Sequence, residues 1–272
     1  MADNGSDSNN GSKSHPFKTL AHALDAVKTN GKIIFIGENI ISNQVISKNI
    51  TLTGINGILK GNNSRILNIT GGVTVTITNL TLKEGCVSDN GGAIYSDGNL
   101  TIGDNVSFRD NIANKSGGAI YNYGGSLCIS GVNTSFINNN AIRSGGAIYS
   151  DIGNVTINGT DTKFLGNFAN GGGAIYNYVG SLCISGFNTS FINNNATSFG
   201  GAIYVDTSSS LIASLCISGV NTIFRCNAAE SGGAIYSNNG NVTINGNDTK
   251  FISNSAAKSI LLKTRSSNPI TL

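Results

Sequence analysis

The pentapeptide Gly-Gly-Ala-Ile-Tyr at residues 91–95 is the most informative stretch of this chain, because it returns every 26 to 32 residues. The later copies begin at Gly117, Gly145, Gly172, Gly200 and Gly232. A second motif, Phe-x-x-Asn, follows each pentapeptide. Its copies are Phe108/Asn111, Phe136/Asn139, Phe164/Asn167, Phe191/Asn194, Phe224/Asn227 and Phe251/Asn254. Two linked motifs with one period indicate a repeat architecture.

Each repeat is predicted to form three short strands. Ala-Ile-Tyr is the first, segments such as Val155–Ile157 are the second, and the residues around each motif phenylalanine are the third. Apolar residues alternate with polar ones, and Gly, Asn, Asp and Ser separate the strands. A repeat of roughly 27 residues is too short for a propeller blade of about 40. The sequence therefore predicts an all-β parallel β-helix of about nine three-stranded rungs, each about 4.8 Å above the last.

Stacking in register predicts columns of like residues along the helix axis. Ile94 and its equivalents are expected to fill one inner column, and the motif phenylalanines another. The paired glycines are expected at a corner that needs a positive φ or leaves no room for a Cβ atom. The motif asparagines are expected at a further corner, in a left-handed conformation and with their amides hydrogen-bonded along the stack. Strict alternation makes the motif tyrosines face outward.

The two ends differ from the repeats at residues 91–254. Residues 1–14 are polar and predict a disordered N-terminus. Residues 15–90 predict divergent opening rungs and an amphipathic capping helix at Phe17–Thr29. Residues 255–272 contain no further motif and predict a tail or an incomplete rung. Its open sheet edge fits either a monomer, an end-to-end assembly, or a piece of a longer protein.

Composition excludes several classes of function. Charged residues make up 11% of the chain against an ordinary share of about 25%, and the net charge is +3. A nucleic-acid binder gathers Lys and Arg on one face, so no nucleic-acid partner is expected. No window approaches the roughly 18 apolar residues of a membrane span. The only histidines, His15 and His22, lie outside the repeats, and no metal or cofactor is expected.

The pairing of Gly-Gly-Ala-Ile with Phe-x-x-Asn resembles the repeats of the chlamydial polymorphic outer-membrane proteins and of methanogen adhesin-like surface proteins. The opening, with Pro16–Leu20 before an Ala-rich helix and then Lys32–Phe35, looks like the start of pectin-lyase-like β-helices. The resemblance implies a right-handed parallel β-helix on a cell surface or outside the cell. It also implies a role in adhesion or as a stalk.

The candidate ligand face combines the motif tyrosines with the residues two positions after them, where Asp and Tyr alternate. It consists of Tyr95, Asp97, Tyr121, Tyr123, Tyr149, Asp151, Tyr176, Tyr178, Tyr204 and Asp206. Aromatic side chains contact sugar rings or peptide side chains, and an evenly spaced ladder suits a repetitive partner. The alternative is that stacked tyrosines only stabilise the sheet. An inserted loop around Thr207–Ala213 lengthens the fifth repeat beside this face.

An enzyme on the same scaffold is the competing hypothesis, namely a polysaccharide lyase or glycoside hydrolase. Asp97, Asp151 and Asp206 are the best carboxylates for it. They fall on alternate rungs, about 9.6 Å apart, at the limit for an inverting pair of roughly 6.5 to 9.5 Å. Because no base or cation stands beside them, the sequence favours a non-enzymatic protein. Its expected partners are glycans or proteins on host or neighbouring cells.

Five cysteines add one further hypothesis. Cys128, Cys183 and Cys216 occupy the repeat position that carries threonine in other rungs. Cys183 and Cys216 fall on adjacent rungs, about 4.8 Å apart, which is inside the Cα range of disulfides. The sequence leaves two possibilities open, half-buried free thiols or a Cys183–Cys216 disulfide.

Overall fold

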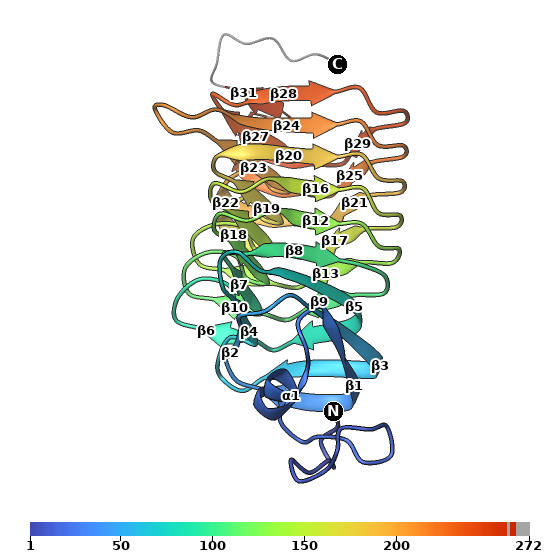
Figure 1. Cartoon of the computed structure of the whole chain (residues 1–272). Coiled ribbons are helices and arrows are strands. Elements are labelled where there is room, and N and C mark those ends of the chain that lie inside the picture. The colour runs from blue at the N-terminus through green and yellow to red at the C-terminus, as the bar shows by residue number, and fades with distance from the viewer. Residues whose placement is uncertain (260–261, 265–272) are drawn as a thin grey trace.

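The computed structural model describes residues 1–259 and 262–264, which form a parallel β-solenoid of about eight turns with one short helix (Figure 1). The strands of these residues lie in three sheets of 15, 9 and 7 strands. Equivalent residues pair from rung to rung, as Ile120 does with Ile94 and Ile148. The prediction of an all-β parallel β-helix is confirmed, and the solenoid is consistent with the right-handed form.

The N-terminal segment folds against the first rung, at the lower end of the solenoid in Figure 1. The polar composition predicts disorder for residues 1–14, but the structure buries Met1 and Ala2 and pairs Ala2 with Ile36. Asp7 accepts hydrogen bonds from the backbone N–H groups of Lys18 and Thr19, each at 2.9 Å. A few specific contacts therefore order a segment whose composition alone suggests none.

Helix α1 spans Leu20–Ala26 and is shorter than the predicted Phe17–Thr29. Thr19 caps it by accepting a hydrogen bond from the His22 N–H, and Val27 already has an extended backbone. The helix buries Leu20 and Leu24 in the core. It covers the apolar lower end, as the first unit of a solenoid must.

The opening rungs use long strands that turn a corner without a break. These are β1 (Gly31–Ile41), β3 (Ile50–Gly61) and β5 (Thr74–Lys83). The first part of β5 pairs with β8 (Asn99–Ile102) and its last part with β9 (Ser107–Arg109). Residues with a positive φ, Gly37, Asn56 and Asn79, stand where these strands bend. From β8 onward the chain forms a separate turn at this corner. The large sheet is therefore divided into two sets of strands, called its first and second arms, which are joined at β5.

The first arm of the large sheet consists of strands with a Leu-x-Ile or Val-x-Ile pattern. They are β8, β12 (Leu127–Ile129), β16 (Val155–Ile157), β20 (Gly180–Ile184), β24 (Ala213–Ile217) and β28 (Asn241–Ile244). The second arm carries the motif phenylalanines. Its strands are β9, β13 (Ser135–Ile137), β17 (Lys163–Leu165), β21 (Ser190–Ile192), β25 (Ile223–Arg225) and β29 (Lys250–Ile252).

The nine-stranded sheet carries the motif tyrosines and is called the tyrosine sheet below. It consists of β2 (Gln44–Ile46), β4 (Leu67–Ile69), β7 (Ile94–Ser96), β11 (Ile120–Asn122), β15 (Ile148–Ser150), β19 (Ile175–Asn177), β23 (Ile203–Asp206), β27 (Ile235–Asn238) and β31 (Leu262–Thr264). A short sheet follows each Phe-x-x-Asn motif. It consists of β6 (Cys86–Val87), β10 (Ile112–Ala113), β14 (Asn140–Ala141), β18 (Phe168–Gly171), β22 (Asn195–Phe199), β26 (Ala228–Ser231) and β30 (Ser255–Ser259).

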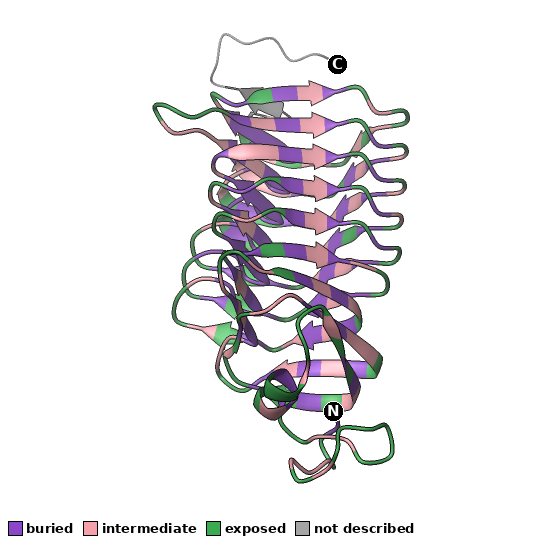
Figure 2. Ribbon diagram, in the orientation of Figure 1, coloured by how far each residue is buried: buried purple, intermediate pink, exposed green. Residues whose placement is uncertain are grey.

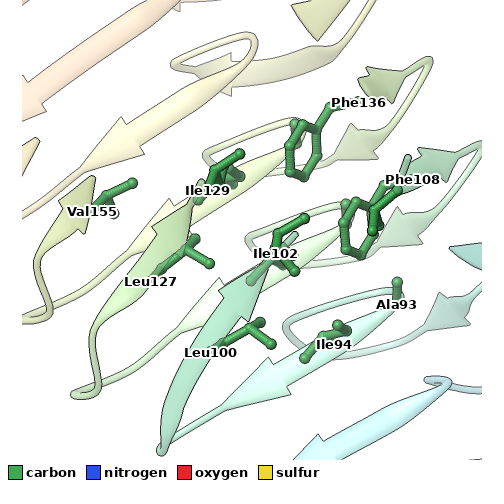
Figure 3. Close-up of a cluster of buried hydrophobic side chains, with 14 of the residues drawn as sticks. Ala93, Ile94, Leu100, Ile102, Phe108, Leu127, Ile129, Phe136 and Val155 are labelled. Atoms are coloured by element: carbon green, nitrogen blue, oxygen red, sulfur yellow. The ribbon is translucent and has the colours of Figure 1, made fainter. Parts of the chain in front are cut away.

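The core is a set of stacked columns, as predicted. Alternation along the strands turns every second side chain inward, which gives the banded burial in Figure 2. Phe108 and Phe136 stack with ring centroids 4.8 Å apart and planes 5° from parallel (Figure 3). Leu100, Ile102 and their equivalents fill the space beside them. Every motif phenylalanine from residue 108 to 224 is fully buried.

The two motif glycines meet two different needs at one corner. The first one has a positive φ in all six copies, for example +65° at Gly145. The second one lies against the next rung, so a Cβ atom at Gly146 would stand 2.1 Å from the Gly173 carbonyl oxygen. The predicted reasons for the glycine pair, a positive φ and missing room for a side chain, both apply, but to different residues.

The motif asparagines form a buried hydrogen-bonded ladder. The Nδ2 group of Asn139 donates to Oδ1 of Asn167 in the next rung at 3.0 Å and to the Phe108 carbonyl at 3.1 Å. Its backbone N–H donates to the same Oδ1 atom. The expectation of amides bonded along the stack is confirmed. The expected left-handed conformation is wrong for these residues, because the residue before each, such as Asn138, has the positive φ.

The last described rung continues the pairing. Strand β30 pairs with β26, and β31 pairs with β27. Residues 260–261 and 265–272, which make up much of the predicted C-terminal tail, lie outside the described residues.

Candidate functional site

The motif tyrosines lie on the outer side of the tyrosine sheet. In β15, Ile148 and Ser150 are buried while Tyr149 between them is half-buried. The same alternation holds at Tyr95 and Tyr204. The tyrosines therefore face outward as predicted, but Tyr121 and Tyr176 are still largely covered by their neighbours.

The rings cover one another because they stack along the axis. Tyr95, Tyr121, Tyr149 and Tyr176 follow each other with ring centroids 5.3, 5.0 and 4.9 Å apart and planes within 14° of parallel. Tyr204 then meets Tyr176 edge-on at 4.7 Å. Between Tyr95 and Tyr176, the ring faces that could have received a sugar ring are thus occupied by other tyrosines. Within this column only ring edges and hydroxyl groups are left for a partner.

Two residues that sequence reasoning missed pack against the tyrosine column, Arg65 at its first ring and Phe199 beside Tyr204 and Tyr236. The guanidinium carbon of Arg65 lies 5.3 Å from the Tyr95 ring centroid, and the same group donates to the Asn90 carbonyl at 2.6 Å. Phe199 packs against both Tyr204 and Tyr236, with ring centroids 5.6 and 4.6 Å apart. Arg65 stands outside the repeats, so spacing alone gave no signal for it.

Carboxylates accept hydrogen bonds from alternate tyrosines. The Tyr121 hydroxyl donates to Asp151 Oδ2 at 3.0 Å, and the Tyr176 hydroxyl donates to Asp206 Oδ2 at 2.6 Å. Burial, followed by the nearby carboxylate, raises the pKa of Tyr121 well above its usual value. Burial and the hydrogen bond to Asp206 raise the pKa of Tyr176 in the same direction. The hydroxyl protons are therefore held in place, and these groups act as fixed donors.

The residues two positions after the tyrosines form a second column, the Asp/Tyr corner. It consists of Asp97, Tyr123, Asp151, Tyr178, Asp206 and Asn238. Backbone bonds hold it in register, from the Tyr123 N–H to the Ser96 carbonyl at 2.8 Å and from the Tyr178 N–H to the Ser150 carbonyl at 2.9 Å. Asp97 and Tyr123 are exposed, whereas Asp151, Tyr178 and Asp206 are half-buried. The exposed residues of the predicted face, Asp97 and Tyr123, therefore both lie in this corner.

Exposed apolar side chains extend the Asp/Tyr corner beyond the prediction. Ile152 follows Asp151 and is 52% exposed, compared with 43% for Tyr123. Leu211 and Ile212 are 54% and 66% exposed in the inserted loop, which projects from the solenoid between β23 and β24 (Figure 1). The available signal was a Leu-Ile pair inside an otherwise Ser-rich insertion.

Neither a metal centre nor a membrane helix is found in the part of the chain that the structure describes. No group of three or more His, Cys, Asp or Glu side chains there could hold a metal ion. No helix among these residues has the length and apolar character needed to cross a membrane.

Comparison with protein families places four matches on the rungs. The Chlamydia polymorphic membrane protein repeat matches residues 105–123, 133–151, 161–178 and 188–206. These four segments of the chain are similar to that repeat. The matches cover about a quarter of the chain. No curated protein and no solved structure matches the chain.

The limits of these repeats coincide with features of the fold. Each match begins at a residue with a positive φ, such as Asn105 or Asn133. These residues lie at the corner between the first and second arms of the large sheet. Each ends at a residue of the Asp/Tyr corner. These end residues are Tyr123, Asp151, Tyr178 and Asp206. Each matched segment of this chain thus comprises a phenylalanine strand, a residue of the asparagine ladder, a glycine corner and a tyrosine strand.

Proposed function

We propose that this chain is a non-enzymatic, adhesin-like protein of a cell surface that binds a protein on a host or neighbouring cell. The observation that carries the proposal is the set of four polymorphic membrane protein repeats on a β-solenoid. Repeats of this type come from chlamydial outer-membrane surface proteins. A rigid column of about eight turns suits the display of a binding surface away from its attachment point.

The Asp/Tyr corner is the surface proposed to meet the partner. Tyr123, Ile152 and the loop residues Leu211 and Ile212 supply exposed aromatic and apolar contacts, and aromatic residues are enriched at binding hot spots. Asp97 and Asp151 add carboxylates between them. This combination suits a protein surface with apolar side chains and a basic rim.

A sugar polymer is a weaker candidate for the same surface. Recognition of sugar rings by stacking needs free aromatic faces, and the tyrosine column uses its faces internally. An enzymatic role is weaker still, because no histidine lies among the rungs to act as a base beside Asp97, Asp151 or Asp206.

A paired set of variants tests the proposal. Binding of the purified chain would be measured on an array of cell-surface proteins and glycans and on intact cells. Tyr123→Ala combined with Tyr178→Ala should weaken binding to a protein target at least tenfold while the β-sheet circular dichroism stays unchanged. Val132→Ala combined with Phe187→Ala is the control, because Val132 and Phe187 are apolar residues at another corner with exposed fractions of 42% and 47%, close to the 43% of Tyr123.

Each other outcome counts against the proposal. Equal binding by the tyrosine variant would remove the Asp/Tyr corner, and loss of binding in the control would place the contact elsewhere. Binding to glycans alone would replace the protein partner with a sugar. Shortening of an acidic polysaccharide in a parallel cleavage assay would favour the lyase or hydrolase.

A further inference from the structure

Two cysteines lie opposite each other on neighbouring strands in the first arm of the large sheet. Strands β20 and β24 pair over five residues, from Gly180 opposite Ala213 to Ile184 opposite Ile217, and this register sets Cys183 directly opposite Cys216. All five cysteines are free thiols in the described residues. Cys183 and Cys216 are half-buried, in contrast to the exposed Cys86 and Cys226.

The two side chains point to the same side of the sheet. The strand residues before and after each cysteine, such as Leu182 and Ile184, are buried in the core, so alternation turns both thiols outward. Opposite residues on neighbouring strands lie about 4.8 Å apart, inside the Cα range of about 4.4 to 6.8 Å for disulfides. The register and the Cα spacing therefore meet the first geometric requirement for a bond between the two cysteines.

The pKa of Cys183 is affected by burial and by the neighbouring Cys216. Burial, and then the neighbouring Cys216 thiol, raise the pKa of Cys183 above its usual value. Because the thiolate is the attacking species in disulfide exchange, the pair is expected to react slowly at neutral pH.

We propose that Cys183 and Cys216 are a site of covalent modification, at which a small-molecule disulfide converts the two thiols into a bond between β20 and β24. The thiolate of one cysteine attacks the small disulfide and releases one small thiol, which leaves a mixed disulfide on the chain. The second cysteine, as its thiolate, then attacks the chain sulfur of the mixed disulfide and releases the other small thiol. The two cysteines lose two electrons and two protons, and the small disulfide gains both.

The bond would staple the rung that carries the inserted loop. The segment between Cys183 and Cys216 includes Asp206, Leu211 and Ile212, so it holds part of the Asp/Tyr corner. Closing this segment lowers the entropy of the unfolded chain and stabilises the folded rung. The proposal stands on the register of two strands and does not depend on the proposed function.

The chain contains its own control. Cys128 occupies the same position two rungs below Cys183 and is equally half-buried, but its neighbours in register are Thr101 and Thr156. The native chain would be held with excess oxidised glutathione until the reaction is complete, and then freed of the reagent. Thiols would then be counted by alkylation under denaturing, non-reducing conditions, and peptides mapped by mass spectrometry. The five thiols should fall to three, with Cys183 and Cys216 in one linked peptide and Cys128 alkylated.

Two variants make the assignment specific. Cys183→Ser should give no linked peptide within the chain. Adding Thr156→Cys to that variant should restore one, now between Cys128 and the introduced thiol, because Thr156 is in register with Cys128. Five free thiols in the native chain, with the engineered pair linked, would overturn the proposal. So would a linkage of Cys183 or Cys216 to any other cysteine, or dimers joined through them on a non-reducing gel.

Discussion

Two aromatic columns run along the same solenoid on opposite sides of its sheets. The phenylalanine column lies inside, with ring centroids 4.7 to 4.9 Å apart and planes within 8° of parallel from Phe108 to Phe251. The tyrosine column lies outside, with spacings of 4.9 to 5.3 Å up to Tyr176 and edge-on contacts beyond it.

The ring-centroid spacings are similar in the two columns because both are set by the distance between neighbouring strands. Strands in register are about 4.8 Å apart, so like rings on them must meet at about that distance. The side of the sheet then decides the consequence. The phenylalanines fill the core, whereas the tyrosines keep hydroxyl groups that bond to Asp151 and Asp206. Only the outer column can combine stacking with polar chemistry.

The largest effect on stability is expected for Phe164→Ala in the inner column. Phe164 is fully buried between Phe136 and Phe191, so truncation leaves a cavity and removes two ring contacts. The free energy of unfolding should fall by about 3 to 5 kcal/mol. Urea titration followed by circular dichroism measures it. A loss below about 1 kcal/mol would mean that the inner column is far less tightly packed than its geometry indicates.

Tyr149→Ala is the matched change in the outer column and should cost less. Tyr149 also lies between two stacked rings, Tyr121 and Tyr176, but it borders solvent and leaves no closed cavity. Each aromatic contact contributes about 0.5 to 1.5 kcal/mol, so loss of the two contacts should cost about 1 to 3 kcal/mol. The same urea titration applies. A loss equal to that of Phe164→Ala would show that the two columns do not differ in their contribution to stability.

High pH should reduce the stability that the tyrosine column contributes but not that of the phenylalanine column, because only tyrosine side chains ionise. Burial is the first cause that raises the pKa of Tyr121, Tyr149 and Tyr176 above the ordinary value of about 10. The folded chain thus holds these protons more tightly than the unfolded chain does. The resulting stability is fully present below about pH 10 and is lost as the pH rises above it.

The measurement is the free energy of unfolding from about pH 8 to about pH 11. The control is the triple variant Tyr121→Phe, Tyr149→Phe and Tyr176→Phe, which keeps every lysine and should lose less stability on going to high pH. Parallel curves for the two proteins would show that the outer tyrosines are not the alkali-sensitive groups.

The smallest effect on stability is expected for Tyr123→Ala. Tyr123 belongs to the Asp/Tyr corner, is exposed, and has no tyrosine stacked on it in the described structure. The unfolding free energy should change by no more than about 0.5 kcal/mol. A larger loss would make Tyr123 part of the packed column and weaken its use as a binding probe.

Much of the candidate site followed from spacing, and some of it did not. The column from Asp97 to Asn238 was predictable, because residues at equivalent positions of a stacked repeat must lie above one another. The sequence left open whether the tyrosines offer free ring faces or stack on one another, and in the structure they stack. Arg65 and Phe199 could not be placed, since neither belongs to the repeated motif.

The sequence alone determined the period, the parallel β-helix and the assignment of residues to columns. The physical reason is that period-two alternation sets the side of a sheet and the repeat length sets the rung. The tertiary structure decided how the side chains in each column meet. It showed that Asn138 and not Asn139 takes the left-handed turn, and that the Tyr121 hydroxyl reaches Asp151 one rung above. Such details depend on backbone bends and side-chain torsions between neighbouring rungs, which residue spacing does not specify.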